Sequence, residues 1–221
     1  MRNGRWAGVL ITVIASGIHP RLAEAALPLP EVLNHMEAQQ QSIQDLNFNF
    51  VERIQAGGFP EQRTVGEVQF KSPHNLRVTQ KTPDKQILVS DGTTFWLYSP
   101  AQQQQLTGSW SAWVKQSHFP LPLIDWAGTL TPERWRTRYT VYFAGFHDSL
   151  YELHFQPKQP GDVPITLWIS EKTFLPVSGR MDQEGSTIQV TLQDMKLNPG
   201  LAASVFQLHV PQGTPTIPVQ F

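Results

Sequence analysis

The sequence predicts a mainly β (α+β) protein built on a curved antiparallel sheet of about ten or eleven strands, with one N-terminal helix. Three observations lead to this fold class. Apolar and polar residues alternate with a period of two along most of the chain after residue 45. Turn residues interrupt these runs about every 8–12 residues, as in antiparallel sheets. The clearest hairpin runs from Gln86 to Pro100, where Asp91-Gly92 separates two β-prone segments.

The two strands of this hairpin carry apolar residues on both faces, not on one. We expect a type I′ turn, because both of its central residues need positive φ, which Gly adopts freely and Asp tolerates. A strand that is apolar on both faces is covered on both. The sequence therefore predicts a second layer over the outside of this hairpin.

Residues 1–25 have the layout of a secretory signal peptide, and residues 26–221 form one domain. Arg2 and Arg5 precede an apolar run over residues 6–18, and Ala23-Glu24-Ala25 is a small-x-small cleavage site. The alternative is an uncleaved anchor. An exported chain of this kind is expected outside the cytoplasm, and its core must hold it together, since it contains no cysteine.

The charge balance of the chain argues against nucleic acid and anionic membrane surfaces as partners. The chain has 17 basic and 18 acidic residues, and removal of residues 1–25 takes away three arginines and one glutamate, which leaves a net charge of −3. No basic patch suited to nucleic acid or to an anionic membrane surface is present.

The elements follow in order. Residues 29–41 show helical spacing, with Pro30 acceptable in the first turn. The predicted strands cover residues 46–52, 65–71, 76–80, 87–89, 94–98, 140–146, 149–156, 165–169, 175–182, 187–195 and 206–209. Residues 102–105 are either a strand edge or a loop, and the secondary structure of residues 109–113 is not defined by the pattern.

An apolar insert interrupts the strands between residues 118 and 135. Pro122 suits the first turn of a short helix that carries Leu123, Ile124 and Trp126. Together with Leu121, these are the candidate lid residues. Thr131-Pro132-Glu133 predicts a second helical turn with Thr131 as N-cap. This insert and the first helix are the elements able to cover a concave sheet.

The inward-facing residues of the sheet admit two interpretations. A large sheet either closes or curls, and an incompletely closed one leaves a concave face. That face is either packed solid, the usual fate of buried aromatic residues, or hollow and able to take an apolar ligand. The candidate lining residues are Leu46, Phe48, Phe50, Val68, Phe70, Leu76, Val78, Leu88 and Trp96.

Three stretches resemble the LolA family of periplasmic outer-membrane lipoprotein carriers. The 87–100 hairpin is the most specific, with Ile-Leu-Val-Ser-Asp-Gly-x-Thr-x-Trp-x-Tyr-x-Pro. Gly66-x-Val-x-Phe-Lys-x-Pro73 followed by Leu76, and Phe206-x-Leu-x-Val-Pro-Gln-Gly213, also match in order, and residues 46–50 fit the family start. Together they span most of residues 26–221.

The resemblance implies an unclosed antiparallel β-barrel of about 11 strands with a lid of short helices. It implies a carrier that binds lipoprotein acyl chains in a hydrophobic cavity and moves them from the inner to the outer membrane. Its expected partners are an inner-membrane ABC transporter complex that releases the lipoprotein and an outer-membrane acceptor lipoprotein, and the carrier is expected to be a monomer.

One position departs from the family pattern. The residue before Pro73 is an arginine that holds the lid shut in the family, and here it is Ser72. A serine cannot reach several carbonyl groups as a guanidinium does. Lys71 and Arg77 are the nearby candidates to replace it.

Two other functional classes remain. A lipid-binding sensor or scaffold of the same half-barrel would act on a protein partner instead of a membrane acceptor. An enzyme is disfavoured, because the chain contains no G-x-S-x-G or H-E-x-x-H motif. Its histidines, His35, His74, His118, His147, His154 and His209 among them, show no metal-ligand spacing. We therefore expect no catalytic residue, no metal and no cofactor.

Overall fold

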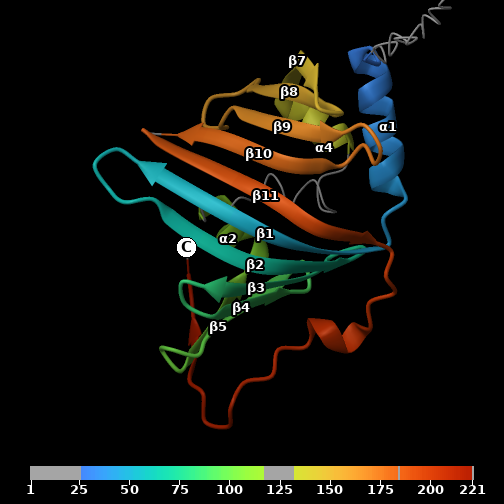
Figure 1. The fold of residues 1–221 in the computed structure, drawn as a ribbon. Helices are drawn as coiled ribbons and strands as arrows, with labels where there is room; N and C mark the ends of the chain where they lie inside the picture. The colour runs from blue at the N-terminus through green and yellow to red at the C-terminus, as the bar shows by residue number, and fades with distance from the viewer. Residues whose placement is uncertain (1–25, 117–131, 184, 221) are drawn as a thin grey trace, which may run out of the picture.

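A computed structural model describes residues 26–116, 132–183 and 185–220. Its strands form one sheet in the order β12-β6-β5-β4-β3-β2-β1-β11-β10-β9-β8-β7 (Figure 1). The first half of the sheet consists of β1 (Asp45–Ala56), β2 (Gln62–Lys71), β3 (Asn75–Thr82), β4 (Gln86–Ser90), β5 (Thr94–Ser99) and β6 (Gln104–Ser109). The second consists of β7 (Tyr139–His147), β8 (Leu150–Pro157), β9 (Ile165–Ser170), β10 (Pro176–Gln183) and β11 (Ser186–Leu197). β12 (Thr216–Pro218) completes it.

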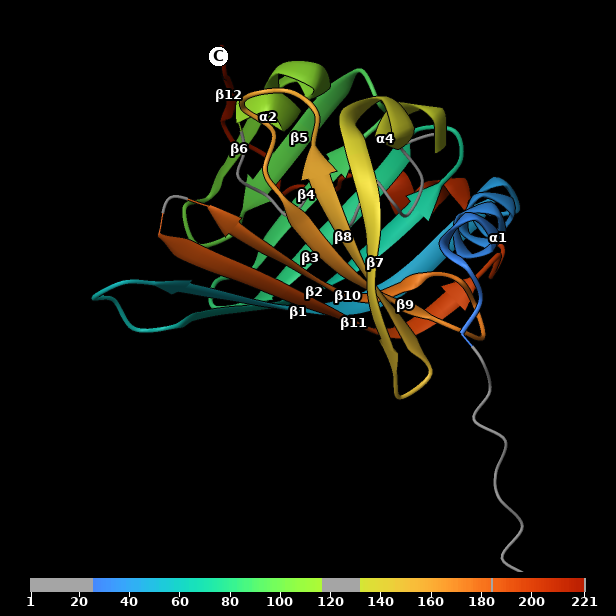
Figure 2. The same ribbon diagram turned by 90° about the horizontal axis from the view of Figure 1, so that it is seen from above.

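Two antiparallel meanders meet at the pairing of β1 with β11, in the middle of the sheet. The terminal strands of the sheet, β12 and β7, do not pair with each other, so the barrel is unclosed. Figures 1 and 2 show the sheet curling toward the side on which α2 (Trp110–Gln116) and α4 (Pro132–Arg138) lie. The expected open, mainly β fold is confirmed.

The long strand β1 shows how the sequence assigns the two faces. Leu46, Phe48 and Phe50 are buried on the concave side, which we call the inner face, and the asparagines between them lie on the outer face. Gly66 lies opposite Phe50 in β2. A Cβ at Gly66 would lie 2.5 Å from Cε1 of the Phe50 ring, so the glycine leaves room for that ring on the inner face.

The helix α1 (Leu29–Gln41) has the predicted bounds. Its buried residues Val32 and Met36 belong to the main hydrophobic core. His35 stacks on Phe174 in the β9–β10 turn, with ring centroids 4.4 Å apart. The helix therefore packs against one end of the curled sheet, as Figure 1 shows.

The 86–100 hairpin forms as predicted, but its turn is of another type. Ser90 pairs with Phe95, and the backbone N–H of Asp91 donates to the Thr94 carbonyl at 3.3 Å, so Gly92 and Thr93 lie at the tip instead of Asp91 and Gly92. Gly92 takes a positive φ of 87°, while Asp91 does not take a positive φ. The Asp91 carboxylate accepts hydrogen bonds from the backbone N–H groups of Thr93 and Thr94, both at 2.8 Å. The predicted type I′ turn is therefore wrong, because Asp91 uses its side chain to bind the following amides and does not occupy a central position with positive φ.

The structure also defines two segments that the sequence left open, and it contradicts one predicted strand. Residues 102–105 lead into β6, and residues 110–116 form α2. The predicted strand at 206–209 is wrong: Ala203–Phe206 is a 3-10 helix, η2, and the next strand, β12, begins at Thr216. Two prolines and a glycine between Val210 and Thr216 break the alternation there.

Residues 198–215, which we call the C-terminal strap, run along the outside of the molecule from the start of β1 to the edge of β6 (Figure 1). Asn198 Oδ1 accepts hydrogen bonds from the backbone N–H groups of Gln44 and Asp45. β12 then pairs in parallel with β6, with Ile217 opposite Leu106. The strap thus lies over the outer face at β2 and β3, where Lys71 and Arg77 bind it. The second layer predicted over the 86–100 hairpin stays a prediction.

Candidate functional site

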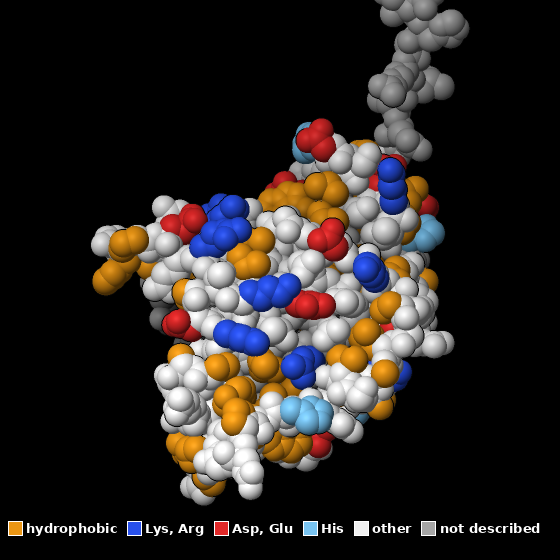
Figure 3. Space-filling view, turned by 60° about the horizontal axis from the view of Figure 1, so that its bottom comes forward, with side chains coloured by type: hydrophobic (Ala, Val, Ile, Leu, Met, Phe, Trp, Pro, Cys, Tyr) orange, Lys and Arg blue, Asp and Glu red, His pale blue; other side chains and the backbone are white. Residues whose placement is uncertain are grey.

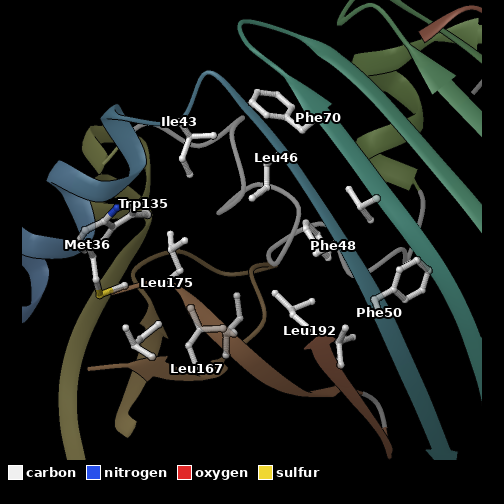
Figure 4. Close-up of a cluster of buried hydrophobic side chains, with 14 of the residues drawn as sticks. Met36, Ile43, Leu46, Phe48, Phe50, Phe70, Trp135, Leu167, Leu175 and Leu192 are labelled. Carbon is white, nitrogen blue, oxygen red and sulfur yellow. The ribbon is translucent and has the colours of Figure 1, made fainter. Parts of the chain in front are cut away.

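The inner face of the sheet is one continuous hydrophobic cluster that draws residues from both meanders and from α1 and α4. Figure 4 shows side chains from α1, β1, β2 and the second meander converging on the same interior. Its members are between 0% and 9% exposed. We take this inner face as the candidate functional site, because the polar groups among the described residues concentrate on the outside.

Eight of the nine predicted lining residues lie in this cluster. They are Leu46, Phe48, Phe50, Val68, Phe70, Leu76, Val78 and Leu88. Pairing explains the grouping: Phe48 lies opposite Val68, Val68 opposite Val78, and Val78 opposite Leu88. Paired residues of an antiparallel sheet share a face, so these side chains form a row across four strands.

Trp96 is the exception and lies on the outer face. It pairs with Val89, the neighbour of Leu88, and Val89 in turn pairs with Arg77. Successive residues of a strand point to opposite sides, so Trp96 faces away from the Leu88 row. Since this hairpin is apolar on both faces, its own sequence gives no sign of which side is inward.

The second wall of the inner face comes from the meander β7–β11, from which the sequence analysis drew no candidate. Its buried residues include Tyr151, Leu153, Phe155, Leu167, Ile169 and Val190. The signal was present as alternation, since every second residue of β8 from Tyr151 to Phe155 is apolar.

Aromatic residues of the short helices pack onto this face. Trp110 and Trp113 of α2 stack at 5.2 Å between centroids, and Trp113 contacts Phe95 of β5. Trp135 of α4 is 2% exposed and meets Phe155 edge-on at 5.9 Å. The helix predicted to begin near Pro132 is confirmed, while Thr131 lies outside the described residues.

The inner face reaches solvent at the β7 edge. Phe143 pairs with the core residue Leu153 and contacts the ring of Tyr151, yet it is 41% exposed. The adjacent Tyr142 pairs with His154 on the outer face and is 54% exposed. A large apolar side chain on the inner face, open to water, is where an apolar ligand could extend the core.

The structure describes the candidate lid-control residue Ser72 but not the candidate lid residues. Leu121, Leu123, Ile124 and Trp126 lie outside the described residues. Ser72 is exposed in the β2–β3 turn, where its backbone N–H donates to the carbonyl of Gln44. Its predicted role in lid control stays a prediction.

Lys71 and Arg77 have other partners in the structure. The Lys71 ammonium donates to the Leu201 carbonyl at 2.6 Å, and the Arg77 guanidinium donates to the Val205 carbonyl at 3.1 Å. Both carbonyl groups belong to the strap. These two cations therefore fasten the strap to the outer face, on the side away from the hydrophobic core.

Charged groups on the outside form mixed pairs. Arg180 binds Asp182 through two nitrogens, and Lys81 lies 3.8 Å from Glu67. The interaction with Arg180 and a hydrogen bond from Thr187 lower the pKa of Asp182. Figure 3 shows Lys and Arg side chains interspersed with Asp and Glu over this side of the molecule.

The described residues contain no group of three or more His, Asp or Glu residues arranged to hold a metal ion. Within the same residues, no helix has the length and hydropathy needed to cross a bilayer.

Known proteins resemble this chain in sequence and in structure. The family described as outer membrane lipoprotein carrier protein LolA matches residues 41–209. An outer-membrane lipoprotein carrier protein of Haemophilus influenzae (strain PittEE) is 32% identical over 99 residues, which are 44% of this chain and 46% of that protein. That alignment thus spans about half of each chain. One from Legionella pneumophila (strain Lens) is 25% identical over 187 residues, 82% of this chain and 87% of that protein.

Solved structures share the fold at low identity. An uncharacterized conserved protein from Thermus thermophilus superposes with a TM-score of 0.56 at 11% identity, over 86% of this chain and 98% of that one. MucB superposes with a TM-score of 0.51 at 15% identity, over 81% of this chain and 62% of that one. The family match covers more than half of the sequence and includes the strands that build the inner face, so this chain belongs to the LolA family.

Proposed function

We propose that this protein carries lipid-modified proteins through the periplasm and shelters their acyl chains on its inner face. The observation that supports this proposal is the continuous hydrophobic inner face, which reaches solvent at Phe143. The names of the relatives, outer-membrane lipoprotein carrier proteins, supply the cargo class.

The physical basis of binding is the burial of apolar surface, worth about 25 cal/mol per Å². A face built from both meanders offers acyl chains apolar contacts on two sides, with no charged group required to hold them. Release then requires an acceptor that removes the chains, because solvent water is a poor competitor for them.

In this proposal an inner-membrane ABC transporter loads the carrier and an outer-membrane lipoprotein unloads it. The carrier acts as a monomer after removal of residues 1–25.

The proposal predicts different effects for two neighbouring substitutions at the β7 edge. Phe143→Asp places a carboxylate on the inner face and should weaken binding of a fluorescent acyl probe about tenfold or more, because the charge must lose water when the probe binds. Tyr142→Asp changes the outer face and should alter the affinity less than about twofold. Both residues are exposed, so neither change should unfold the protein. Fluorescence titration with competition by a triacylated lipopeptide measures the effect.

Absence of saturable probe binding to the wild-type protein would contradict the carrier proposal. Equal losses in the two variants would show that the probe does not occupy the inner face. Recovery of a signalling protein instead of lipoproteins, after cross-linking in cells, would favour a lipid-binding sensor or scaffold with the same half-barrel.

A further inference from the structure

Glu52 differs from Asp45, the other buried carboxyl group among the described residues. Asp45, also buried, accepts hydrogen bonds from the backbone N–H groups of Gly200 and Leu201, at 3.0 and 3.2 Å. Ser90 accepts one from Gly92. Glu52 is 8% exposed, and its one protein partner given by the structure is the hydroxyl of Thr64. A buried carboxyl group with so little support is costly to the fold and calls for an explanation.

The Glu52 side chain lies on the inner face. It follows Phe50 by two residues along β1 and pairs with Val190 of β11, and both of these belong to the hydrophobic cluster. Burial raises the pKa of Glu52, and the hydrogen bond from Thr64 opposes part of this effect. The inner-face neighbours in the described parts of β1, β2 and β11 are apolar or uncharged, so none of them offers a cation to the carboxyl group.

Along the inner face of β1, apolar residues are followed by a carboxyl group, much as the acyl chain of an amphiphile is followed by its polar head. Leu46, Phe48 and Phe50 form an apolar row that begins beside α1, and Glu52 follows directly at the end toward the β1–β2 hairpin. The distance along the strand from Leu46 to Glu52 is about 20 Å. This length is comparable to the ~15 Å of hydrocarbon in one bilayer leaflet. Acyl chains laid along the row would therefore bring their polar head to the carboxyl group.

We propose that Glu52 is a binding residue for the head of the cargo and accepts hydrogen bonds from N–H groups next to the acyl chains, as in an acylated amino terminus. A carboxylate accepts such bonds more strongly than a neutral oxygen. The same group repels an anionic head, so it disfavours free fatty acids. This inference rests on the proposed carrier function and adds a preference among lipids that share the same chains.

Two probes with one acyl chain test the preference. One is a fluorescent fatty acid, and the other is the same acid joined through an amide bond to glycinamide, which replaces the carboxylate with N–H donors. The wild-type protein should bind the amide about tenfold more tightly than the acid. Glu52→Leu should bring the two affinities within about twofold, and Glu52→Gln should improve binding of the acid, because the negative charge is gone.

Gln55→Leu is the matched control, since Gln55 is on the outer face of the same strand. It should keep the wild-type ratio of the two affinities. An equal ratio in wild type and Glu52→Leu, or a wild-type protein without preference, would overturn the inference and leave the carrier function standing. If Glu52→Leu fails to fold, an unchanged ratio in Glu52→Gln overturns it equally. Failure of both probes to bind the wild type would instead remove the carrier function.

Discussion

Glu52 shows at the level of one residue how a functional preference conflicts with stability. Its carboxyl group is buried among apolar side chains of β1 and β11, where an ionised group loses most of its hydration. A hydrophobic residue would pack there at lower cost. Sites that bind ligands commonly retain such unfavourable groups, because the ligand supplies the missing partner.

This position predicts a specific dependence of stability on pH. The pKa of Glu52 is raised in the folded protein, so the native state binds more protons than the unfolded state, and stability falls as pH rises from about 4.5 through the raised value. Glu52→Gln removes this loss. The variant should match wild type near pH 4 and exceed it at pH 7 by on the order of 1 kcal/mol in urea unfolding.

Glu67→Gln serves as the comparison, because Glu67 pairs with Lys81 on the outer face. It should not gain stability at pH 7. Parallel pH profiles for wild type and Glu52→Gln would show that the Glu52 carboxyl group is not held in an apolar environment.

Individual residues also mark the limit of prediction from sequence. Alternation assigned Leu46, Phe48 and Phe50 to the inner face correctly, because polar asparagines occupy the other side of β1. The prediction that Trp96 lines the inner face is wrong, because its hairpin is apolar on both sides and only the pairing of β4 with β3 distinguishes them. Glu52 was not recognised, since a single charged residue in a strand resembles an outward-facing position.

At the scale of elements, the C-terminal strap is an outer layer held by a few long-range contacts. Lys71 and Arg77 bind its carbonyl groups, and Asn198 fixes its start. The hairpins could be predicted from local turn residues, whereas the strap pairs with residues about 130 positions earlier in the chain. Local sequence patterns do not reveal such contacts, which is why the strand predicted at residues 206–209 of the strap is wrong.

Arg77→Met should loosen the strap without affecting the inner face. It removes the hydrogen bonds to the Val205 and Gln207 carbonyl groups and leaves an apolar stem of similar length. Amide hydrogen exchange in residues 203–207 should accelerate about tenfold, while binding of an acyl probe remains within about twofold of wild type. Mass spectrometry of exchanged peptides measures the first effect.

Lys81→Met is the matched control, since Lys81 also lies in β3 but contacts Glu67 and Asn49. Exchange in the strap should not change in this variant. Unaltered exchange in Arg77→Met would mean that Lys71 and Asn198 hold the strap without it.

At the scale of the whole molecule, cargo bound on the inner face should raise the free energy of unfolding, because this face exists only in the folded sheet. A ligand that binds only the folded state stabilises it by mass action, by about 2.7 kcal/mol at 100 times its dissociation constant. Addition of the amide-linked acyl probe at this concentration should therefore raise the free energy of unfolding of the wild-type protein by that amount. Urea unfolding with and without the probe measures it, and a short-chain amide serves as control. An unchanged unfolding midpoint would contradict binding to the native inner face.

The overall architecture followed from the sequence more fully than the site did. Period-two alternation and regular turns predict a curved antiparallel sheet, and the family resemblance implies that it is unclosed. The pairing of β1 with β11 joins the two halves of this sheet. Which residues of β8 to β11 form the second wall of the inner face follows only from the pairing register of these strands. The candidate lid residues 121–126 remain a prediction.

The parallel pairing of β12 with β6 determines how copies of this protein could associate through their sheets. β12 is three residues long, follows Pro215 and ends at Pro218, so it offers few groups to a further strand, while β7 presents a nine-residue edge. Growth of a fibre requires every copy to offer two complementary edges. With a single long edge available among the described strands, stacking through the sheet would stop at a pair.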